Sequence, residues 1–337
     1  MLSNKNILIV ISFALVTAFN ACKQDNSKDT DKESSDLNTA TTSETLDTAF
    51  EVNLNNPLAD EAITLRLNPP KGTVYWIETT ASFTSDERMD TLRMKGNSSK
   101  WVKSKLVVKD NNEKQVIFEY MLTDERKNVK NDSMQLTYQY GKPNSNPDQE
   151  IDRKIEDCLI NSPLTLKLDK FGTGSDVQGY EAILKKVKAI VGENMPDQLI
   201  ASNLGSPTEN VEYFFITYPE KALKIGDTWT QETPSIMQGV PITLYTTYTL
   251  ADRKDGVAYI NFTTAISVDK SKLPSDFAAE VDKIKFDAWI KGAGQINEST
   301  GFPIVMQVTQ AMEVNDDYQG VKTHSKQSGT TTIRLIQ

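Results

Sequence analysis

Apolar and polar residues alternate with a period of two along much of the chain after residue 70. A β-strand places successive side chains on opposite faces, so each such run predicts a strand with one apolar face and one wet face. Strands of that kind belong to antiparallel sheets. The clearest runs are residues 75–83, 116–122, 258–266 and 304–313.

Short turn sequences rich in Gly, Asn, Asp and Lys separate the runs and join neighbouring strands locally. These turns lie at residues 70–72, 95–97, 110–112, 252–256 and 298–301. The chain is therefore predicted to be mainly β with minor α: a curved, largely antiparallel meander sheet or half-barrel. Two or three helices are expected to pack on its concave side.

The helices are expected where the spacing of apolar residues changes. From Tyr180 to Val191, apolar residues recur every three or four positions, and Gly192 follows. That spacing forms one apolar stripe on an α-helix, and glycine commonly ends a helix. Shorter helices are predicted over residues 196–204 and 275–282. They are interpreted as core elements because no Gly-rich phosphate loop precedes them.

The N-terminal residues predict an exported, lipid-anchored protein. Residues 1–21 have a basic start, an apolar run too short to span a membrane, and a small residue before Cys22. Residues 19–22, Phe-Asn-Ala-Cys, resemble the bacterial lipobox. This resemblance implies that a diacylglyceryl group is attached to the thiol of Cys22. An unmodified cysteine in a plain signal peptide is the alternative.

The predicted organisation has three parts. Residues 1–21 form a lipoprotein signal peptide. Residues 22–57 form a disordered, acidic, Ser/Thr-rich tether, because they contain too few apolar side chains to offset the entropy of ordering. Residues 58–337 form a single antiparallel β-rich domain, and two similar halves joined by a helical segment near 176–205 are kept as an alternative within it.

The expected location is the outer membrane. Cys22 and Lys23, followed closely by acidic residues, resemble the export signal of surface lipoproteins of Bacteroidota. Both a periplasmic and a surface-exposed orientation are kept open. The chain has 37 basic and 46 acidic residues, a formal net charge of −9, which disfavours nucleic acids and anionic membrane surfaces as partners. The expected partners are the membrane, through the anchor, and either an apolar small molecule or an envelope protein.

Residues for common catalytic centres are scarce. His324 is the only histidine and lies in a polar alternating segment, so it is expected at the surface, and Cys158 is expected to be buried. This scarcity argues against a zinc site and a Ser-His-Asp triad, so no metal, no cofactor and no enzymatic activity are predicted. Adjacent carboxylates at 124–125 and 316–317 leave a carboxylate-dependent hydrolase as a distant alternative.

One local motif is more specific than the others. Residues 224–229 are Lys-Ile-Gly-Asp-Thr-Trp. Together with Lys-Gly-Thr-Val-Tyr at 71–75 and Thr-Gly-Phe-Pro at 300–303, this motif resembles a family of outer-membrane lipoproteins of Bacteroidota whose function is unknown. The resemblance covers residues 60–337 and implies no activity. Gly226, Asp227 and Trp229 are interpreted as fold markers, in which Gly226 makes a turn and Trp229 packs on the core.

Two functions remain compatible with these patterns. The first is a non-enzymatic binding or carrier module for an apolar or small ligand, with a concave groove walled by Trp76, Phe118, Phe262 and Met306. The second is an envelope structural or interaction protein that binds a partner or a glycan. In addition, three Asp-Ser/Thr-apolar triplets resemble O-glycosylation sites of Bacteroidota envelope proteins. The residues that would carry the glycan in these triplets are Thr48, Thr91 and Ser133.

Overall fold

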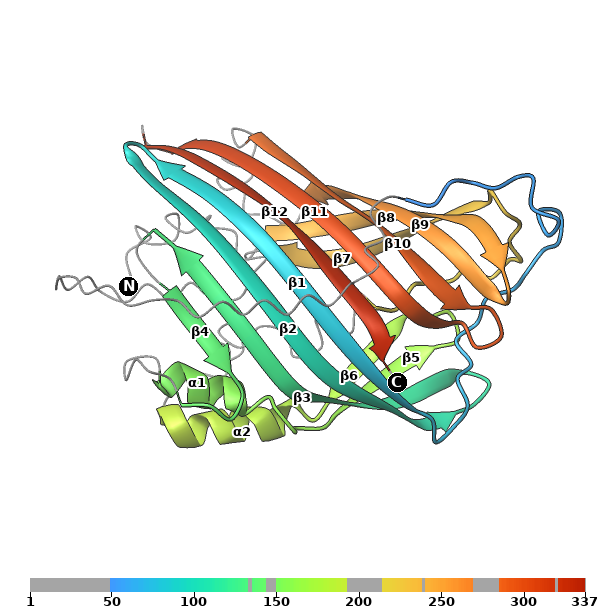
Figure 1. The fold of residues 1–337 in the computed structure, drawn as a ribbon, viewed down its shortest axis with the longest axis horizontal. Helices are drawn as coiled ribbons and strands as arrows, with labels where there is room; N and C mark the ends of the chain where they lie inside the picture. Colours follow the sequence, from blue (N-terminus) through green and yellow to red (C-terminus); the bar gives the residue numbers. More distant parts are fainter. Residues whose placement is uncertain are drawn as a thin grey trace.

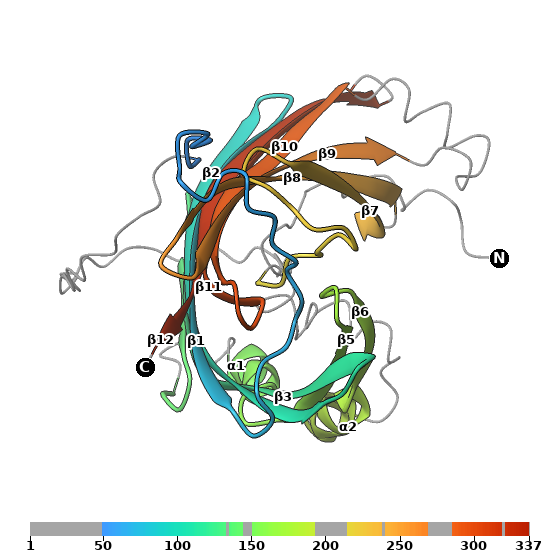
Figure 2. The same cartoon turned by 90° about the vertical axis from the view of Figure 1, so that its right-hand side faces the viewer.

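The computed structural model describes residues 49–132, 135–143, 150–192, 214–237, 240–268, 285–318 and 321–336. Within these residues, twelve strands form one antiparallel sheet that is not closed into a barrel. The sheet curves strongly, so that it is C-shaped in end view (Figures 1 and 2). The prediction of a mainly β, curved meander sheet is confirmed.

The strands of the first half of the sheet are β1 (Val74–Met89), β2 (Leu92–Asn111), β3 (Gln115–Asn131), β4 (Gln135–Gln139), β5 (Leu164–Asp169) and β6 (Gly174–Gln178). Those of the second half are β7 (Thr228–Met237), β8 (Val240–Lys254), β9 (Val257–Val268), β10 (Lys285–Asn297), β11 (Phe302–Tyr318) and β12 (Val321–Ile336).

The first and last strands meet in the centre of the sheet. The spatial order is β6-β5-β3-β2-β1-β12-β11-β10-β9-β8-β7, and β4 pairs with β3 outside this path. β1 and β12 pair continuously from Trp76 opposite Ile336 to Met89 opposite Thr323. Each half of the chain thus forms one wing of the sheet as a local meander, and one long-range pairing joins the wings.

Bulges interrupt the register near one end of the long strands. They lie between Lys103 and Ser104 in the pairing of β2 with β3, and between Gln295 and Ile296 in the pairing of β10 with β11. A further bulge follows Leu250 in β8. A bulge bends its strand and increases the local twist, which contributes to the curvature of the sheet.

The hydrophobic core covers the concave face at this same end, which is called the packed end below. Phe118 and Tyr120 of β3 are fully buried, as is Leu106 of β2. Two segments cover them, residues 63–73 and 214–227, and both lie inside the curve of the sheet (Figure 2). An aromatic cluster centres on Phe302, whose ring is stacked on Tyr75 at 3.9 Å between centroids.

The covering segments approach the sheet very closely. Gly301 has a φ of +58°, and a Cβ at this position would lie 2.2 Å from the backbone oxygen of Arg66. The turn after β10 therefore requires glycine, both for its backbone conformation and for the contact with the segment above it. Tyr218 of the second covering segment donates a hydrogen bond to the Gly301 carbonyl at 2.7 Å.

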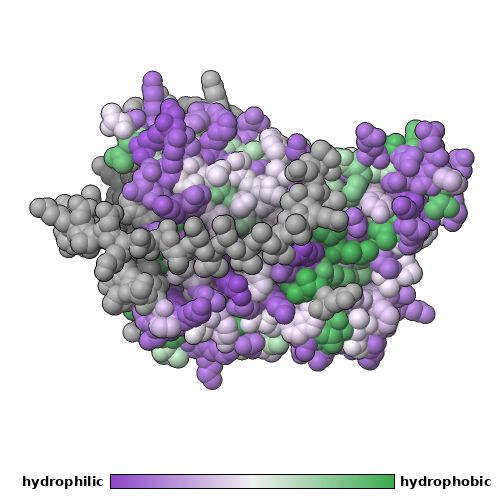
Figure 3. All heavy atoms as spheres, in the orientation of Figure 1, coloured by the Kyte–Doolittle hydropathy of each residue, from purple (hydrophilic) through white to green (hydrophobic). Residues whose placement is uncertain are grey.

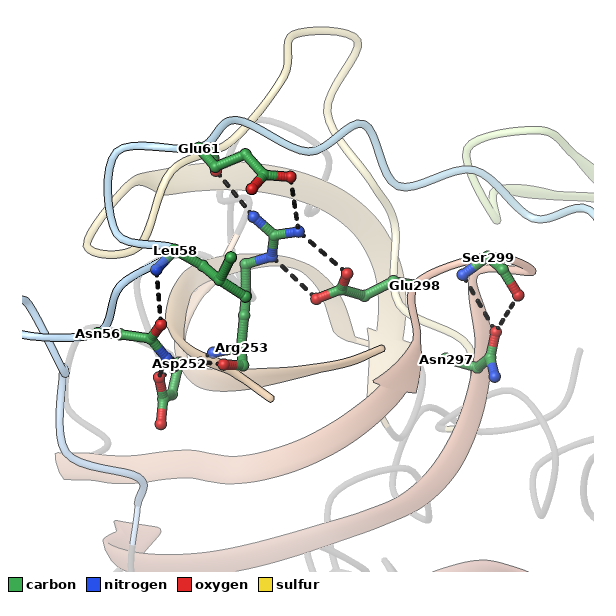
Figure 4. A network of polar contacts seen from close by, with 8 residues as sticks. All are labelled: Asn56, Leu58, Glu61, Asp252, Arg253, Asn297, Glu298 and Ser299. Atoms are coloured by element: carbon green, nitrogen blue, oxygen red, sulfur yellow. Dashed lines mark hydrogen bonds and ion pairs between the residues drawn. The ribbon is translucent and has the colours of Figure 1, made fainter. Parts of the chain in front are cut away.

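A buried polar network fastens residues 53–61 to the packed end (Figure 4). The Arg253 side chain is 4% exposed and forms a bidentate pair with Glu298, at 2.9 and 3.0 Å. It also donates to the carbonyl of Glu61 at 2.8 Å. Asn56 donates to Asp252 at 2.6 Å. Each of the three guanidinium nitrogens of Arg253 donates a hydrogen bond, which lowers the cost of burying this charge.

The helix predicted from Tyr180 is confirmed. α2 spans Tyr180–Val191, ends before Gly192, and buries Ile183 and Val187 in the core. α1, Glu150–Asp157, was not predicted, since it buries no residue of its own and has no apolar stripe. Instead, Lys127, on the concave face of β3, holds Glu156 at 3.3 Å. The helices predicted over 196–204 and 275–282 lie outside the described residues.

The predicted signal peptide, Cys22, and the tether as far as residue 48 lie outside the described residues. The last part of the predicted tether, from residue 49, is described and packs on the sheet. Phe50 exchanges two hydrogen bonds with the side chain of Asn261 in β9, at 2.8 and 2.7 Å. Its ring meets Tyr259 edge-on at 5.0 Å. The packed chain therefore includes residues from Phe50 onward.

Candidate functional site

The concave face continues well beyond the packed end, because the central strands have 16 or more residues each. The name distal concave face is used here for the inward-facing residues of this second part. Strand register brings Phe83 of β1 opposite Gly329 of β12, and Gln310 of β11 opposite Ile290 of β10. The apolar members are Phe83, Ile266, Ala288, Ile290 and Met312.

Glycines allow aromatic rings to lie flat across this face. A Cβ at Gly329 would lie 2.0 Å from Cδ1 of Phe83, so the ring occupies the space above the glycine. Toward the packed end, Gly292 has the same relation to Phe262, because a Cβ at Gly292 would lie 2.4 Å from Cζ of that ring. A side chain at either glycine would push the ring away. The two glycines therefore leave space for the apolar rings of Phe83 and Phe262 on the concave side of the sheet.

Among the described residues, the distal concave face has a small recess. A recess of about 20 Å³ lies between Phe83, Ile266, Ile290 and Met312. That volume is far below the several hundred Å³ of an enclosing small-molecule pocket. A ligand here would lie along the wall of the sheet, as an extended apolar chain does, and would not be enclosed.

The rim of this face is apolar and exposed. Met89, Leu92 and Met94, at the tip of the β1–β2 hairpin, are 48%, 61% and 43% exposed. Met89 pairs with Leu92, and Met94 pairs with Glu87, so all three belong to the concave side by register. Sequence reasoning missed them, although the same alternation that placed Phe83 on the concave face extends to Met89.

Two adjacent acidic residues show how differently the two faces are solvated. Asp86 points to the convex side, where its hydrogen bonds to Arg93 lower its pKa to about 2. Glu87 points to the concave side, where burial raises the pKa of its carboxyl group above the ordinary 4.5. Nearby, Ser325 is 8% exposed, and its hydroxyl has no hydrogen-bond partner within the described part of the chain. The concave side is therefore poorly hydrated even near the rim.

Three of the four residues predicted to form one groove wall belong to the core of the packed end, and the fourth lies on the opposite face of the sheet. Phe118 and Met306 are buried in the core of the packed end. Phe262 is half-buried there and lies 5.9 Å from the ring of Tyr248. Trp76 lies on the convex face, beside Lys103 at 4.9 Å. The period of two explains this placement, because the neighbours of Trp76 in sequence, Tyr75 and Ile77, face inward.

The Lys-Ile-Gly-Asp-Thr-Trp motif forms a turn and a core contact. Gly226 has a φ of +91°, and the side chain of Asp227 accepts a hydrogen bond from the backbone N–H of Lys224 at 2.9 Å. Trp229 is 8% exposed, stacks on Tyr248 at 5.1 Å, and donates from Nε1 to the Thr217 carbonyl at 2.7 Å. Each of these contacts is internal to the fold.

The other candidate residues are scattered. Thr91 is exposed at the tip of the β1–β2 hairpin, whereas Thr48 and Ser133 lie outside the described residues. His324 lies on the convex face with its Nδ1 2.8 Å from the side-chain oxygen of Asn315. Cys158 is buried, as predicted.

The adjacent carboxylates Asp124 and Glu125 each have a basic partner of their own. Glu125 is 4% exposed and bound to Lys100 at 3.2 Å, whereas Asp124 lies 3.6 Å from Arg126. The side chains at 316–317 lie outside the described part. Among the described residues, no group of three His, Cys, Asp or Glu side chains is arranged to hold a metal ion. None of the helices in the described segments is both long and apolar enough to cross a membrane.

The convex face differs from the concave face in surface character. Seen from this side, hydrophilic residues dominate over the distal ends of β1 and β2 (Figure 3). The fold and site thus define an open, curved antiparallel β-sheet protein with a hydrophobic core on its concave side. The model of a family of unknown function, DUF6263, matches residues 115–303, which is more than half of the chain. The chain belongs to this family. Its predicted link to lipoproteins of Bacteroidota stays a prediction.

No curated protein matches the chain in sequence. Among solved structures, it is similar to lipovitellin, in a structure concerned with lipid–protein interactions, with 11% identity and a TM-score of 0.45. The match covers 80% of this chain and 25% of lipovitellin, so the chain spans a quarter of that protein.

A second similar structure is DynF of Micromonospora chersina, with 7% identity, a TM-score of 0.19, and coverage of 86% of this chain and 89% of that one. A third is OccK7 of Pseudomonas aeruginosa, with 6% identity, a TM-score of 0.21, and coverage of 78% and 99%. Likeness at these scores carries no inference about function.

Proposed function

We propose that the protein is a non-enzymatic binding or carrier module that holds an apolar ligand along its distal concave face. One observation carries the proposal. The strands that close the buried core continue past the covering segments, where Phe83, Ile266, Ile290 and Met312 form an apolar patch, and the β1–β2 hairpin beyond it exposes Met89, Leu92 and Met94. Contiguous apolar surface on a soluble domain commonly marks a binding site.

The chemistry of the wall suits a flexible apolar ligand. Methionine side chains are unbranched and polarisable, so they adapt to ligands of different shape. Near the rim, the Ser325 hydroxyl and the half-buried Glu87 add hydrogen-bonding capacity on the same face. The proposed ligand class is therefore an extended hydrocarbon chain with a small polar end.

The first test measures binding of an apolar fluorescent dye, N-phenyl-1-naphthylamine, to the mature chain. Phe83→Asp places a charge on the wall and should weaken dye binding by about tenfold or more. Ser82→Asp adds the same charge one residue away on the convex face and should leave binding unchanged. Equal binding by both variants and the wild type would refute the proposal.

A milder variant guards against misfolding of Phe83→Asp. Leu92 is 61% exposed, so Leu92→Ser should leave the circular dichroism spectrum unchanged. It should still weaken dye binding, by about threefold, because the rim loses apolar contact area.

The proposal also includes a lipid anchor at Cys22 that holds the domain in the cell envelope. Intact-mass measurement of the native protein should show acyl chains on Cys22. A Cys22→Ser variant should leave the membrane fraction. A native chain without acyl chains would remove the anchor from the proposal but not the binding face.

A further inference from the structure

A second recess, of about 600 Å³, lies at the packed end and is separate from the distal concave face. It is called the basic pocket below. Four segments far apart in sequence form it: residues 64–68, the β2–β3 turn at 113–114, the β5–β6 turn at 170–171, and the β10–β11 turn at 298–299. Its volume lies within the range of small-molecule sites.

Arg66 places an uncompensated positive charge in this pocket. Its guanidinium donates to the backbone carbonyls of Leu65 and Pro219 at 2.7 and 2.8 Å, and to that of Glu220 at 2.6 Å. It lies 4.4 Å above the ring of Phe171. All these partners are neutral, and Arg66 forms no ion pair within the described part of the chain. A guanidinium has five N–H donors, so two remain available.

Lys170 adds a second positive charge of the same kind. Its ammonium group donates to the side-chain oxygens of Asn68, at 3.1 Å, and Asn111. It forms no ion pair with a described residue, and desolvation lowers the pKa of its amino group. Two amide oxygens hold this cation in place but do not neutralise it. One donor of the ammonium group is left for a ligand.

The acidic residues of the pocket do not neutralise these cations. Glu298 is already bound in a bidentate pair by Arg253 (Figure 4). Glu113 lies exposed on the β2–β3 turn, where Lys114 follows it. The remaining charge of the lining is therefore positive, although the whole chain has a net charge of −9.

We propose that the basic pocket binds a phosphate-type oxyanion, either free or as the headgroup of a lipid. The forked guanidinium of Arg66 and the ammonium of Lys170 supply charge-assisted donors, and such hydrogen bonds are stronger than those between neutral groups. The pocket has more volume than a bare phosphate needs, so an organic part of the ligand fits beside Phe171. This site is independent of the distal concave face.

The experiment titrates the mature chain with inorganic phosphate by calorimetry and measures its sedimentation with phosphatidylglycerol vesicles. Lys170→Met should weaken binding by about tenfold, and Lys114→Gln by about threefold. Lys142→Gln is the control, because Lys142 is an exposed lysine in the turn after β4. It should bind like the wild type.

The two probes distinguish the two sources of the anion. Binding of phosphate alone indicates a free oxyanion, and binding of vesicles alone indicates a lipid headgroup. Either result supports the site if the Lys114→Gln variant binds that probe more weakly than the wild type. This substitution alters only an exposed side chain. Absence of binding to both probes would overturn the proposal. Binding that Lys114→Gln and Lys170→Met leave unchanged would overturn it as well.

Discussion

The packed end and the distal concave face are two parts of the same inner surface, built by the same strands. At the packed end, Phe118 has no exposed surface, and two chain segments cover it. On the distal concave face, Phe83 is only half-buried, and the rim beyond it exposes 61% of Leu92. The alternation over residues 75–83 runs from the packed end to Phe83, so it decides which face a residue occupies but not what covers it.

This difference assigns stability to the packed end and the proposed binding role to the distal concave face. The packed end holds the aromatic cluster, the Arg253–Glu298 pair and both helices, so the fold does not depend on closing the distal part. The packed end can therefore supply most of the stability of the molecule. The following predictions test whether the two parts differ in this way.

The largest expected contrast is between two phenylalanines. Phe118→Ala should lower the free energy of unfolding by about 3–5 kcal/mol, because it leaves a cavity in a fully packed core. Phe83→Ala should lower it by about 1 kcal/mol or less, since its ring is half-exposed. Urea denaturation followed by circular dichroism measures both. Equal losses would mean that the distal part is as tightly packed as the core.

A second contrast compares two arginine–carboxylate pairs. Arg253→Met should cost about 3 kcal/mol, because it leaves Glu298 without its partner in a buried network. Arg93→Met, at the distal hairpin tip, should leave the urea midpoint within measurement error, because the pair with Asp86 is exposed and screened by solvent. A loss of stability in Arg93→Met that matches the loss in Arg253→Met would contradict the comparison.

A third contrast uses two tryptophans. Trp229→Phe removes the Nε1 hydrogen bond to Thr217 and should cost about 1 kcal/mol in unfolding free energy. Trp289 lies in the distal part of β10 and is 40% exposed. Trp289→Phe should give a thermal midpoint indistinguishable from that of the wild type. A reversed order would show that the distal part contributes more to stability than the packed end.

The smallest expected effect concerns pH. Burial raises the pKa of Glu87 in the folded state, so the folded protein holds this proton more tightly than the unfolded chain does. Stability from this group is fully present below the ordinary pKa and is lost as pH rises through the folded pKa. Glu87→Gln should therefore match the wild type at about pH 4 and be slightly more stable at about pH 8.

Asp86→Asn is the control for this prediction. The pKa of Asp86 is lowered, so its contribution is present above the ordinary pKa and is lost as pH falls toward about 2. The two variants should change the pH dependence of stability in opposite directions. No change in the pH dependence for either variant would mean that both carboxylates face water.

Much of the fold could be predicted from the sequence, because local patterns determine it. The alternation over residues 116–122 places Phe118 and Tyr120 inward, and the spacing from Tyr180 predicts α2 to the residue. The pairing of β1 with β12 could not be predicted in this way, since it joins residues more than 230 positions apart. α1 escaped prediction because ion pairs from Arg153 and Lys127 hold it, and not an apolar stripe.

The candidate site was harder to predict than the fold. The predicted groove wall includes Trp76, although the period of two places it on the convex face with Glu78. The rim residues Met89 and Leu92 follow from the same period once the hairpin turn at Asp90 is placed. The basic pocket has no local pattern, since Arg66, Lys114 and Lys170 meet only through the tertiary fold.

The most direct test of the central claim is photo-crosslinking in the native envelope, with benzoylphenylalanine at position 83 or, as a control, at position 82. Mass spectrometry of the irradiated protein should find an adduct with a lipid or another hydrocarbon chain at position 83 and none at position 82. A protein adduct at position 83 would favour an interaction module instead. The binding role of the distal concave face would be contradicted by the absence of any adduct at position 83, or by identical adducts at both positions.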